Sequence, residues 1–203
     1  MRIFLAGATG VIGERVVPLL RSAGHDVAGM TRSPAKAEAL VALGARPVVC
    51  DVFEGERLES ELVSFAPEVL VHLLTDLPDE PSRIAELAGV NNRIRTEGTA
   101  NLLSAARAAR CGRVLAESVA WTLPGAGEAA AAELERSVLA AGGVVLRYGQ
   151  LYGPGTYYPA EAPGPPRVHV DEAAHRTIEA LEAPSGVVTI VDGAGEGDPP
   201  RRS

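Results

Sequence analysis

A short glycine-rich stretch near the amino terminus has the residue types and the spacing to bind a dinucleotide. The sequence GATGVIG places Gly7, Gly10 and Gly13 directly after an apolar run. The first glycine permits a tight turn, the second lets a pyrophosphate approach the backbone, and the third lets helix and strand pack closely. The following helix would offer free amides to the phosphates. We expect cofactor contacts at Gly7, Thr9, Gly10, Val11, Ile12 and Gly13; a turn used only for packing is the alternative.

Basic residues follow the second apolar run, where proteins that select NAD usually carry an acidic residue. Arg32 stands there within MTRSPAK, and Lys36 lies one turn into the next predicted helix. A guanidinium can bind the 2′-phosphate of NADP with two parallel hydrogen bonds and can stack on the adenine. The pattern therefore favours NADP(H) over NAD(H), although an arginine at a strand end can also be simply solvated.

The end of the third apolar run offers a further contact for the nucleotide. Asp51 and Val52 stand there, in the sequence CDVFE. The Asp51 carboxylate can accept a hydrogen bond from an adenine amino group. We expect both residues near the adenine, with a surface aspartate that caps the turn as the alternative.

Short runs rich in Val, Ile and Leu alternate along the chain with longer, alanine-rich segments. This alternation is typical of a parallel sheet covered by helices on both faces. The predicted strands span residues 2–7, 26–32, 45–50, 69–75, 113–118, 144–149 and 186–192. The predicted helices span residues 10–23, 34–43, 56–65, 92–109, 128–141 and 171–182. Asp171 is expected to cap the last helix with its carboxylate.

The carboxyl-terminal part of the chain differs in composition from the rest. Residues 152–166, YGPGTYYPAEAPGPP, are rich in proline and glycine and are expected to form a loop. The tail GAGEGDPPRRS carries almost no apolar surface and is expected to fray. We therefore divide the chain into a dinucleotide-binding core at 1–150, a reduced substrate-side segment at 151–192 that completes the same domain, and a flexible tail at 193–203.

Composition narrows the classes of function. The formal net charge of −7 leaves no basic stripe, so nucleic acid is not an expected partner. Cys50 and Cys111 form neither a Cys-x-x-Cys pair nor a Cys/His cluster, so no metal site is expected and a reducing cytoplasm fits. No uncharged apolar run approaches the roughly 18 residues of a membrane span. The strand predicted from residue 2 leaves no room for a secretory signal. We expect a cytoplasmic protein without a membrane partner.

Further motifs follow in an order that resembles a known superfamily. After GATGVIG, TRSPAK and CDV come RTEGTANLLSAARAA, LAESVAW, VVLRYGQLYGPG and HVDEAA. Together they resemble the extended and atypical branches of the short-chain dehydrogenase/reductase superfamily, close to NAD-dependent epimerase/dehydratase-like proteins. The resemblance runs from Met1 to about Asp192. It implies an α/β Rossmann fold: a doubly wound parallel sheet with helices on both faces and a very small carboxyl-terminal substrate lobe.

The resemblance also implies roles for individual residues. Ser118, in LAESVAW, matches the family's serine or threonine that hydrogen-bonds the substrate oxygen. Leu74 and Thr75 are expected to pass near the nicotinamide ribose, and Tyr152 begins the turn that borders the substrate cleft. We take Ser118 and Tyr152 as candidate catalytic residues, with a structural serine and a covering tyrosine as the alternatives. Glu117, beside Ser118, is another candidate acid or base, and only one of the two adjacent side chains can face the cleft.

The chain departs from the family at its proton-transfer residues. The family's tyrosine and lysine fall near Gly127 and Ala131, and neither side chain present can transfer a proton. Lys36 is the only lysine in the chain, and no tyrosine begins a Tyr-x-x-x-Lys sequence. Thr156 to Val168 spans only 13 residues, where relatives have a longer excursion that helps to build the substrate pocket. We therefore expect an open cleft and a mechanism without the Tyr-Lys pair.

Three functions fit these observations. The first is an NADP(H)-binding small-molecule oxidoreductase or isomerase of the short-chain dehydrogenase/reductase type. The alternatives are a non-catalytic binding module regulated by nucleotide, and a cyclase on the same scaffold that performs no net redox step. Extended relatives form dimers through the helices that match 92–109 and 128–141, so we expect a homodimer there, with ordinary surface helices as the alternative.

Overall fold

A single parallel sheet organises the chain, as seen in a computed structural model that describes residues 1–78 and 80–193. Seven strands lie in the order β3-β2-β1-β4-β5-β6-β9, and all of their pairings are parallel. The direction of winding reverses between β1 and β4, which is the point where open α/β sheets bind ligands. The strands are β1 (Arg2–Ala6), β2 (Asp26–Thr31), β3 (Arg46–Val49), β4 (Val69–His72), β5 (Arg113–Val119), β6 (Val144–Tyr148) and β9 (Gly186–Ile190).

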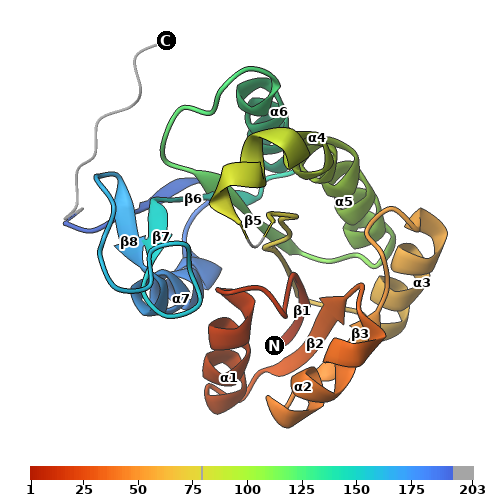
Figure 1. Cartoon of the computed structure of the whole chain (residues 1–203). Helices are drawn as coiled ribbons and strands as arrows, with labels where there is room; N and C mark the ends of the chain where they lie inside the picture. The colour runs from red at the N-terminus through yellow and green to blue at the C-terminus, as the bar shows by residue number, and fades with distance from the viewer. Residues whose placement is uncertain (79, 194–203) are drawn as a thin grey trace.

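Helices cover both faces of this sheet (Figure 1). One face is covered by α1 (Gly13–Ser22), the short pair η1 (Pro34–Lys36) and α2 (Ala37–Ala42), and α7 (Val170–Glu179) with η4 (Ala180–Glu182). The other face is covered by α3 (Gly55–Phe65), α5 (Thr99–Ala108) and α6 (Ala126–Ala140). Ahead of α5 the chain forms η2 (Pro81–Arg83), α4 (Ile84–Arg93) and the π-helical turn η3 (Ile94–Gly98).

Each face of the sheet has its own apolar core. Ile3 and Leu5 of β1 point toward α1 and α7, and Phe4 points toward α3 and α5. All three side chains are fully buried. Because both faces of the strands are covered, they are continuous apolar runs instead of an alternation of apolar and polar residues.

The predicted α/β fold with a doubly wound parallel sheet is confirmed, and all seven predicted strands are present. Two details of the prediction were wrong. The helix predicted from residue 92 begins at Ile84, because α4, η3 and α5 follow one another without a break. The cap of α7 is His169, whose Nδ1 accepts a hydrogen bond from the Asp171 amide, and not the Asp171 carboxylate.

The segment after residue 150 adds a small sheet and returns to the large one. Strands β7 (Gln150–Tyr152) and β8 (Arg167–His169) pair in parallel and flank the loop predicted at 152–166. Strand β9 then pairs with β6 at the edge of the large sheet. The predicted tail lies almost wholly outside the described residues. No helix among the described residues is both long and apolar enough to span a membrane. The homodimer and the domain limits stay predictions.

Candidate nucleotide and active site

The glycine-rich turn has the shape that a pyrophosphate requires. Gly7 has a positive φ of 91°, and a Cβ there would collide with the carbonyl of Leu73 at the end of β4. A Cβ on Gly13 would collide with the carbonyl of Gly7. Gly10 is exposed between them, three residues before α1, and its carbonyl accepts a 2.9 Å hydrogen bond from the Glu14 amide in the first turn of the helix. An exposed glycine backbone at the positive end of a helix is a feature that favours anion binding.

The turn is attached to the end of β2, where Arg32 stands. The hydroxyl oxygens of Thr9 and Thr31 lie 3.3 Å apart, and Thr31 Oγ1 accepts a hydrogen bond from the amide of Ser33. Arg32 itself donates two hydrogen bonds to the Asp76 carboxylate, of 2.8 and 2.7 Å. These hydrogen bonds raise the pKa of the Arg32 guanidinium, and burial partly offsets the effect. Sequence reasoning missed Asp76.

The other residues predicted near the adenosine follow the neighbouring strands. Lys36 is exposed at the end of η1. Asp51 is half-buried, and its Oδ1 accepts a 3.0 Å hydrogen bond from the Phe53 amide. The Val52 side chain is buried, and its carbonyl accepts a 3.0 Å hydrogen bond from Asn101. Because β1, β2 and β3 are parallel neighbours, the structure brings these residues to the same edge of the sheet as the glycine turn.

The end of β4 contributes to this edge from the other side of β1. Leu74 is half-buried and Thr75 is exposed. The Leu74 amide donates a hydrogen bond to Nδ1 of His72, whose Nε2 lies 3.2 Å from the Thr99 hydroxyl. Burial lowers the pKa of His72 to about 4, so the ring is neutral at pH 7. His72 thus fixes the start of the loop that carries Leu74 and Thr75.

Adjacent residues of β5 point to opposite faces, and this separates Ser118 from Glu117. Ser118 is buried on the face covered by α6, where its hydroxyl donates a 2.6 Å hydrogen bond to Glu135. Glu135 also accepts hydrogen bonds from Arg147 of β6. Glu117 pairs in register with Leu146, which packs on the face covered by α1 and α7.

Glu117 carries the most perturbed carboxyl group of the site. Burial raises its pKa to about 7, and the positive charge of Arg95 partly offsets this effect. Arg95 lies in η3 and donates a 3.5 Å hydrogen bond to Asn92. A carboxyl group with a pKa near neutrality can both release and take up a proton at pH 7.

Two small, buried residues of α6, Gly127 and Ala131, stand at the positions of the missing tyrosine and lysine. A Cβ on Gly127 would lie 3.2 Å from Cβ of Leu123 and 3.7 Å from Oδ1 of Asn92. Ala131 is buried, 7% exposed, on the inner side of α6. A side chain at Gly127 would therefore need a small shift of Leu123.

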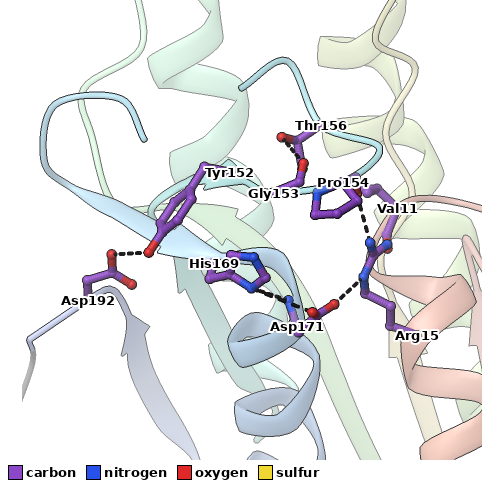
Figure 2. Close-up of polar contacts among 9 residues, drawn as sticks. All are labelled: Val11, Arg15, Tyr152, Gly153, Pro154, Thr156, His169, Asp171 and Asp192. Carbon is purple, nitrogen blue, oxygen red and sulfur yellow. Dashed lines mark hydrogen bonds and ion pairs between the residues drawn. The ribbon is translucent and has the colours of Figure 1, made fainter. Parts of the chain in front are cut away.

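Tyr152 lies on the small sheet, apart from β5. Its hydroxyl donates a 3.0 Å hydrogen bond to Asp192, and its ring packs edge-on against His169 (Figure 2). The hydroxyls of Ser118 and Tyr152 are therefore not brought together. Their catalytic roles stay predictions.

An arginine of α1 attaches the small sheet and its loop to the glycine turn. Arg15 contacts Asp171 of α7 at 2.6 Å, the Pro154 carbonyl at 2.7 Å and the Val11 carbonyl at 2.8 Å (Figure 2). Farther along the loop, the Tyr157 hydroxyl donates to the carbonyl of Pro78, beyond β4. The proline-rich loop therefore extends from the glycine turn to the segment that follows β4. The described residues contain no cluster of His, Cys, Asp and Glu that could hold a metal ion.

Comparison with protein-family models assigns the chain to a family. Residues 3–128 match the model of the NAD dependent epimerase/dehydratase family. The chain belongs to this family. It is 36% identical over 239 aligned residues to a 3-diazoavenalumate denitrifying reductase of a Streptomyces species, across 95% of this chain and 76% of the relative. The alignment is longer than the 203 residues of this chain, so the relative carries segments that this family member lacks.

Solved structures of the family share the fold. UDP-glucose 4-epimerase of Thermus thermophilus, in complex with NAD, superposes with a TM-score of 0.78 at 20% identity, covering 96% of this chain and 78% of that one. The UDP-glucose 4-epimerase of Thermotoga maritima, with UDP-glucose, gives a TM-score of 0.78 at 19% identity and the same coverage. At these identities the likeness shows the fold alone, and the substrates of the two enzymes are not transferred to this chain.

Proposed function

We propose that this family member is an NADP(H)-dependent reductase of a small molecule, and that it acts without the Tyr-Lys pair. The observation that carries the proposal is the exposed backbone of Gly10 at the carboxyl edge of the sheet, with Arg32 beside it. The amides of the α1 amino terminus would bind the pyrophosphate, and Arg32 would bind the 2′-phosphate. Asp51, Leu74 and Thr75 would line the same groove on either side.

A reductase fits the chain better than an epimerase does. The relative that matches 95% of this chain at 36% identity is named a reductase, whereas the epimerase structures match at 20% identity or less. An epimerase that first oxidises a substrate hydroxyl needs a base to remove its proton. Gly127 and Ala131, at the positions of the family's tyrosine and lysine, cannot provide that base, so another residue such as Glu117 would have to supply it.

The relative's substrate suggests a type of hydride acceptor that can be reduced without a proton donor in the protein. NADPH supplies a hydride when it is bound. An aryl diazonium group already carries a positive charge, so it can accept the hydride on its terminal nitrogen without a proton from the protein. In the resulting aryl diazene the N–H and C–N bonds then break, and the hydrogen moves as a proton from nitrogen to the ring carbon. N2 leaves and the arene remains, which balances both atoms and charge. We therefore propose an electrophile of this kind as the substrate class.

Glu117 is the residue proposed to handle any proton that the reaction does move. Its side chain lies on the face of α1 and α7 at the carboxyl end of β5, and its pKa of about 7 suits exchange at neutral pH. Arg95 would position the carboxylate and stabilise its charged form. Ser118, with Tyr152, is the proposed alternative to Glu117, because only one of the adjacent side chains of β5 can face the cleft.

The test follows the absorbance of NADPH in the presence of candidate acceptors. The panel contains an aryl diazonium compound, an aryl aldehyde and a nucleotide sugar, each with NADPH and with NADH. We expect oxidation of NADPH to depend on the diazonium compound and release of N2 to match it. Nucleotide binding without oxidation by any acceptor would support the alternative, a nucleotide-regulated binding module. The observation that favours this alternative is that Gly127 and Ala131 are buried at the positions of the missing tyrosine and lysine.

A further inference from the structure

The contact between Arg32 and Asp76 crosses the edge where a dinucleotide would bind. Arg32 follows the last residue of β2, and Asp76 lies four residues beyond His72, the last residue of β4. Strand β1 lies between these two strands, and the glycine turn leaves the sheet from its end. The predicted contacts of the adenosine follow β2 and β3, and those of the nicotinamide ribose follow β4. The ion pair therefore spans the line along which the cofactor would extend.

Asp76 is held in place by its own backbone. Its amide donates a 3.1 Å hydrogen bond to Oδ1 of Asn91, and Asn91 is buried, 5% exposed. The Asp76 side chain is 25% exposed, whereas the Arg32 side chain is 62% exposed. Arg32 is thus the partner that is free to move, and Asp76 is the fixed one.

The same face of the guanidinium serves the carboxylate and the phosphate. Asp76 occupies both NH1 and NH2 of Arg32, which is the fork that binds a phosphate with two parallel hydrogen bonds. We propose that Asp76 is a specificity-determining residue of the nucleotide site: its carboxylate occupies the Arg32 fork in the free protein, and a nucleotide 2′-phosphate must replace it there. This inference rests on the proposed function, because it concerns the same site.

The proposal has a direct consequence for the choice of nucleotide. The carboxylate competes with a 2′-phosphate for Arg32 and repels its charge, but it does neither with the ribose hydroxyl of NAD(H). Asp76 therefore lowers the affinity for NADP(H) selectively. Removal of its charge should increase the preference for NADP(H) that Arg32 favours.

Asp76→Asn tests the proposal by calorimetric titration. The probes are NADPH, NADH, adenosine 2′,5′-bisphosphate and adenosine 5′-monophosphate, so that binding is measured apart from turnover. Because the variant removes both the competition for Arg32 and the repulsion of the phosphate, we expect NADPH and the bisphosphate to bind about five- to twentyfold tighter. The Kd values of NADH and of the monophosphate should change by less than about twofold.

Asp26→Asn is the matched control. Asp26 is the first residue of β2, the strand that Arg32 follows, so it lies at the opposite edge of the sheet from Arg32. Its Oδ1 is 3.8 Å from NH1 of Arg21. The control makes the same change in net charge, so it should leave all four affinities as they are. If it tightens NADPH binding as much as Asp76→Asn does, the effect is one of total charge and the proposal is wrong.

Arg32→Ala distinguishes this proposal from the proposed function. In the Arg32→Ala background, Asp76→Asn should improve NADPH binding by only about twofold, because the contested fork is gone. Binding of NADPH to the unaltered protein with no gain from Asp76→Asn would overturn the role of Asp76 and leave the proposed function intact. Failure of every variant to bind either nucleotide would overturn both. A melting curve of each variant establishes that it folds, and Asp76→Ser repeats the test if the asparagine variant does not.

Discussion

Ser118 donates its hydroxyl hydrogen to Glu135 across 2.6 Å, on the side of β5 that is covered by α6. Its neighbour Glu117 faces the other side of the sheet, which is covered by α1 and α7. The residue that the family resemblance marks as catalytic is therefore hydrogen-bonded to a half-buried carboxylate, and the residue beside it carries the perturbed pKa. Replacement of Ser118 should therefore lower the stability of the fold, whereas replacement of Glu117 should raise it at neutral pH.

Ser118→Ala should affect stability more than nucleotide binding. The variant removes one hydrogen bond to the half-buried Glu135 carboxylate, which still forms an ion pair with Arg147. We expect the free energy of unfolding to fall by about 1 to 2 kcal/mol, measured by urea titration. Ser60→Ala, on an exposed position of α3, is the control and should change stability by a few tenths of a kcal/mol. A large loss of turnover with unchanged stability would instead support a catalytic Ser118.

Glu117→Gln should make the protein more stable at neutral pH and above. The folded-state pKa of Glu117 is raised from 4.5 to about 7 by burial, so the folded chain holds its proton more tightly than the unfolded chain does. The stabilisation is full below pH 4.5 and is lost as the pH rises through about 7, by on the order of 3 kcal/mol. Glu117→Gln should remove this contribution, so that urea titrations at several pH values show the opposing slope of His72, with stability rising from about pH 4 to pH 7.

Glu59→Gln is the control for that series. Glu59 is exposed on α3, so its replacement should leave the pH dependence as it is. An unchanged slope in Glu117→Gln would mean that Glu117 is ionised at no cost at pH 7, and would remove it as the proposed proton-handling group.

The sequence was sufficient for the fold and for the nucleotide edge of the site, for a physical reason. Apolar runs separated by helices leave few arrangements other than a parallel sheet, and a glycine needed at a positive φ, such as Gly7, is recognisable from its neighbours. The start of α4 at Ile84 was missed although Ile84, Leu87 and Ala88 have the spacing of an apolar helix face, because Gly89 and Asn91 have low helix propensity. Local signals could not reveal the pairing of β7 with β8, because the residues between them do not determine it.

The orientation of side chains at the site was harder to predict than the identity of the residues. Which of Glu117 and Ser118 faces the cleft depends on the register of β5, and a shift of one residue exchanges them. The contact between Arg32 and Asp76 joins residues 44 positions apart. Asp76 belongs to no recognisable sequence motif. Its contact with Arg32 is evident only from the fold, in which the segments after β2 and β4 meet beyond the end of β1.

His72→Gln should reduce the loss of folding stability that occurs as the pH falls from about 6.5 toward 4. The folded-state pKa of His72 is lowered from 6.5 to about 4 by burial, so the unfolded chain takes up the proton first. The stabilisation from neutral His72 is full above pH 6.5 and is lost as the pH falls toward 4, by on the order of 3 kcal/mol. This slope opposes that of Glu117, so each appears clearly only when the other is removed. His175→Gln, exposed on α7, should leave the slope unchanged, and a similar effect of both variants would contradict the prediction.

Arg15→Ala should loosen the proline-rich loop and the glycine turn together. Arg15 binds a carboxylate of α7, the carbonyl of Pro154 in the loop and the carbonyl of Val11 in the turn, all within 2.8 Å. Lysine has a single ammonium group and cannot satisfy the three acceptors with the same geometry, so Arg15→Lys should recover only part of the loss.

We expect Arg15→Ala to lower the free energy of unfolding by about 1 to 2 kcal/mol, because the guanidinium is partly buried and makes several hydrogen bonds. Amide hydrogens of residues 153–158 and of the glycine turn should exchange faster, measured by mass spectrometry. Arg21→Ala, near the other end of α1, also removes a hydrogen bond to a carbonyl, that of His25, but should leave exchange in the loop unchanged. If exchange rises in the loop alone, Pro154 and the turn are held independently. A rise in both segments would mean that movement of the loop reaches the residues expected to bind phosphate.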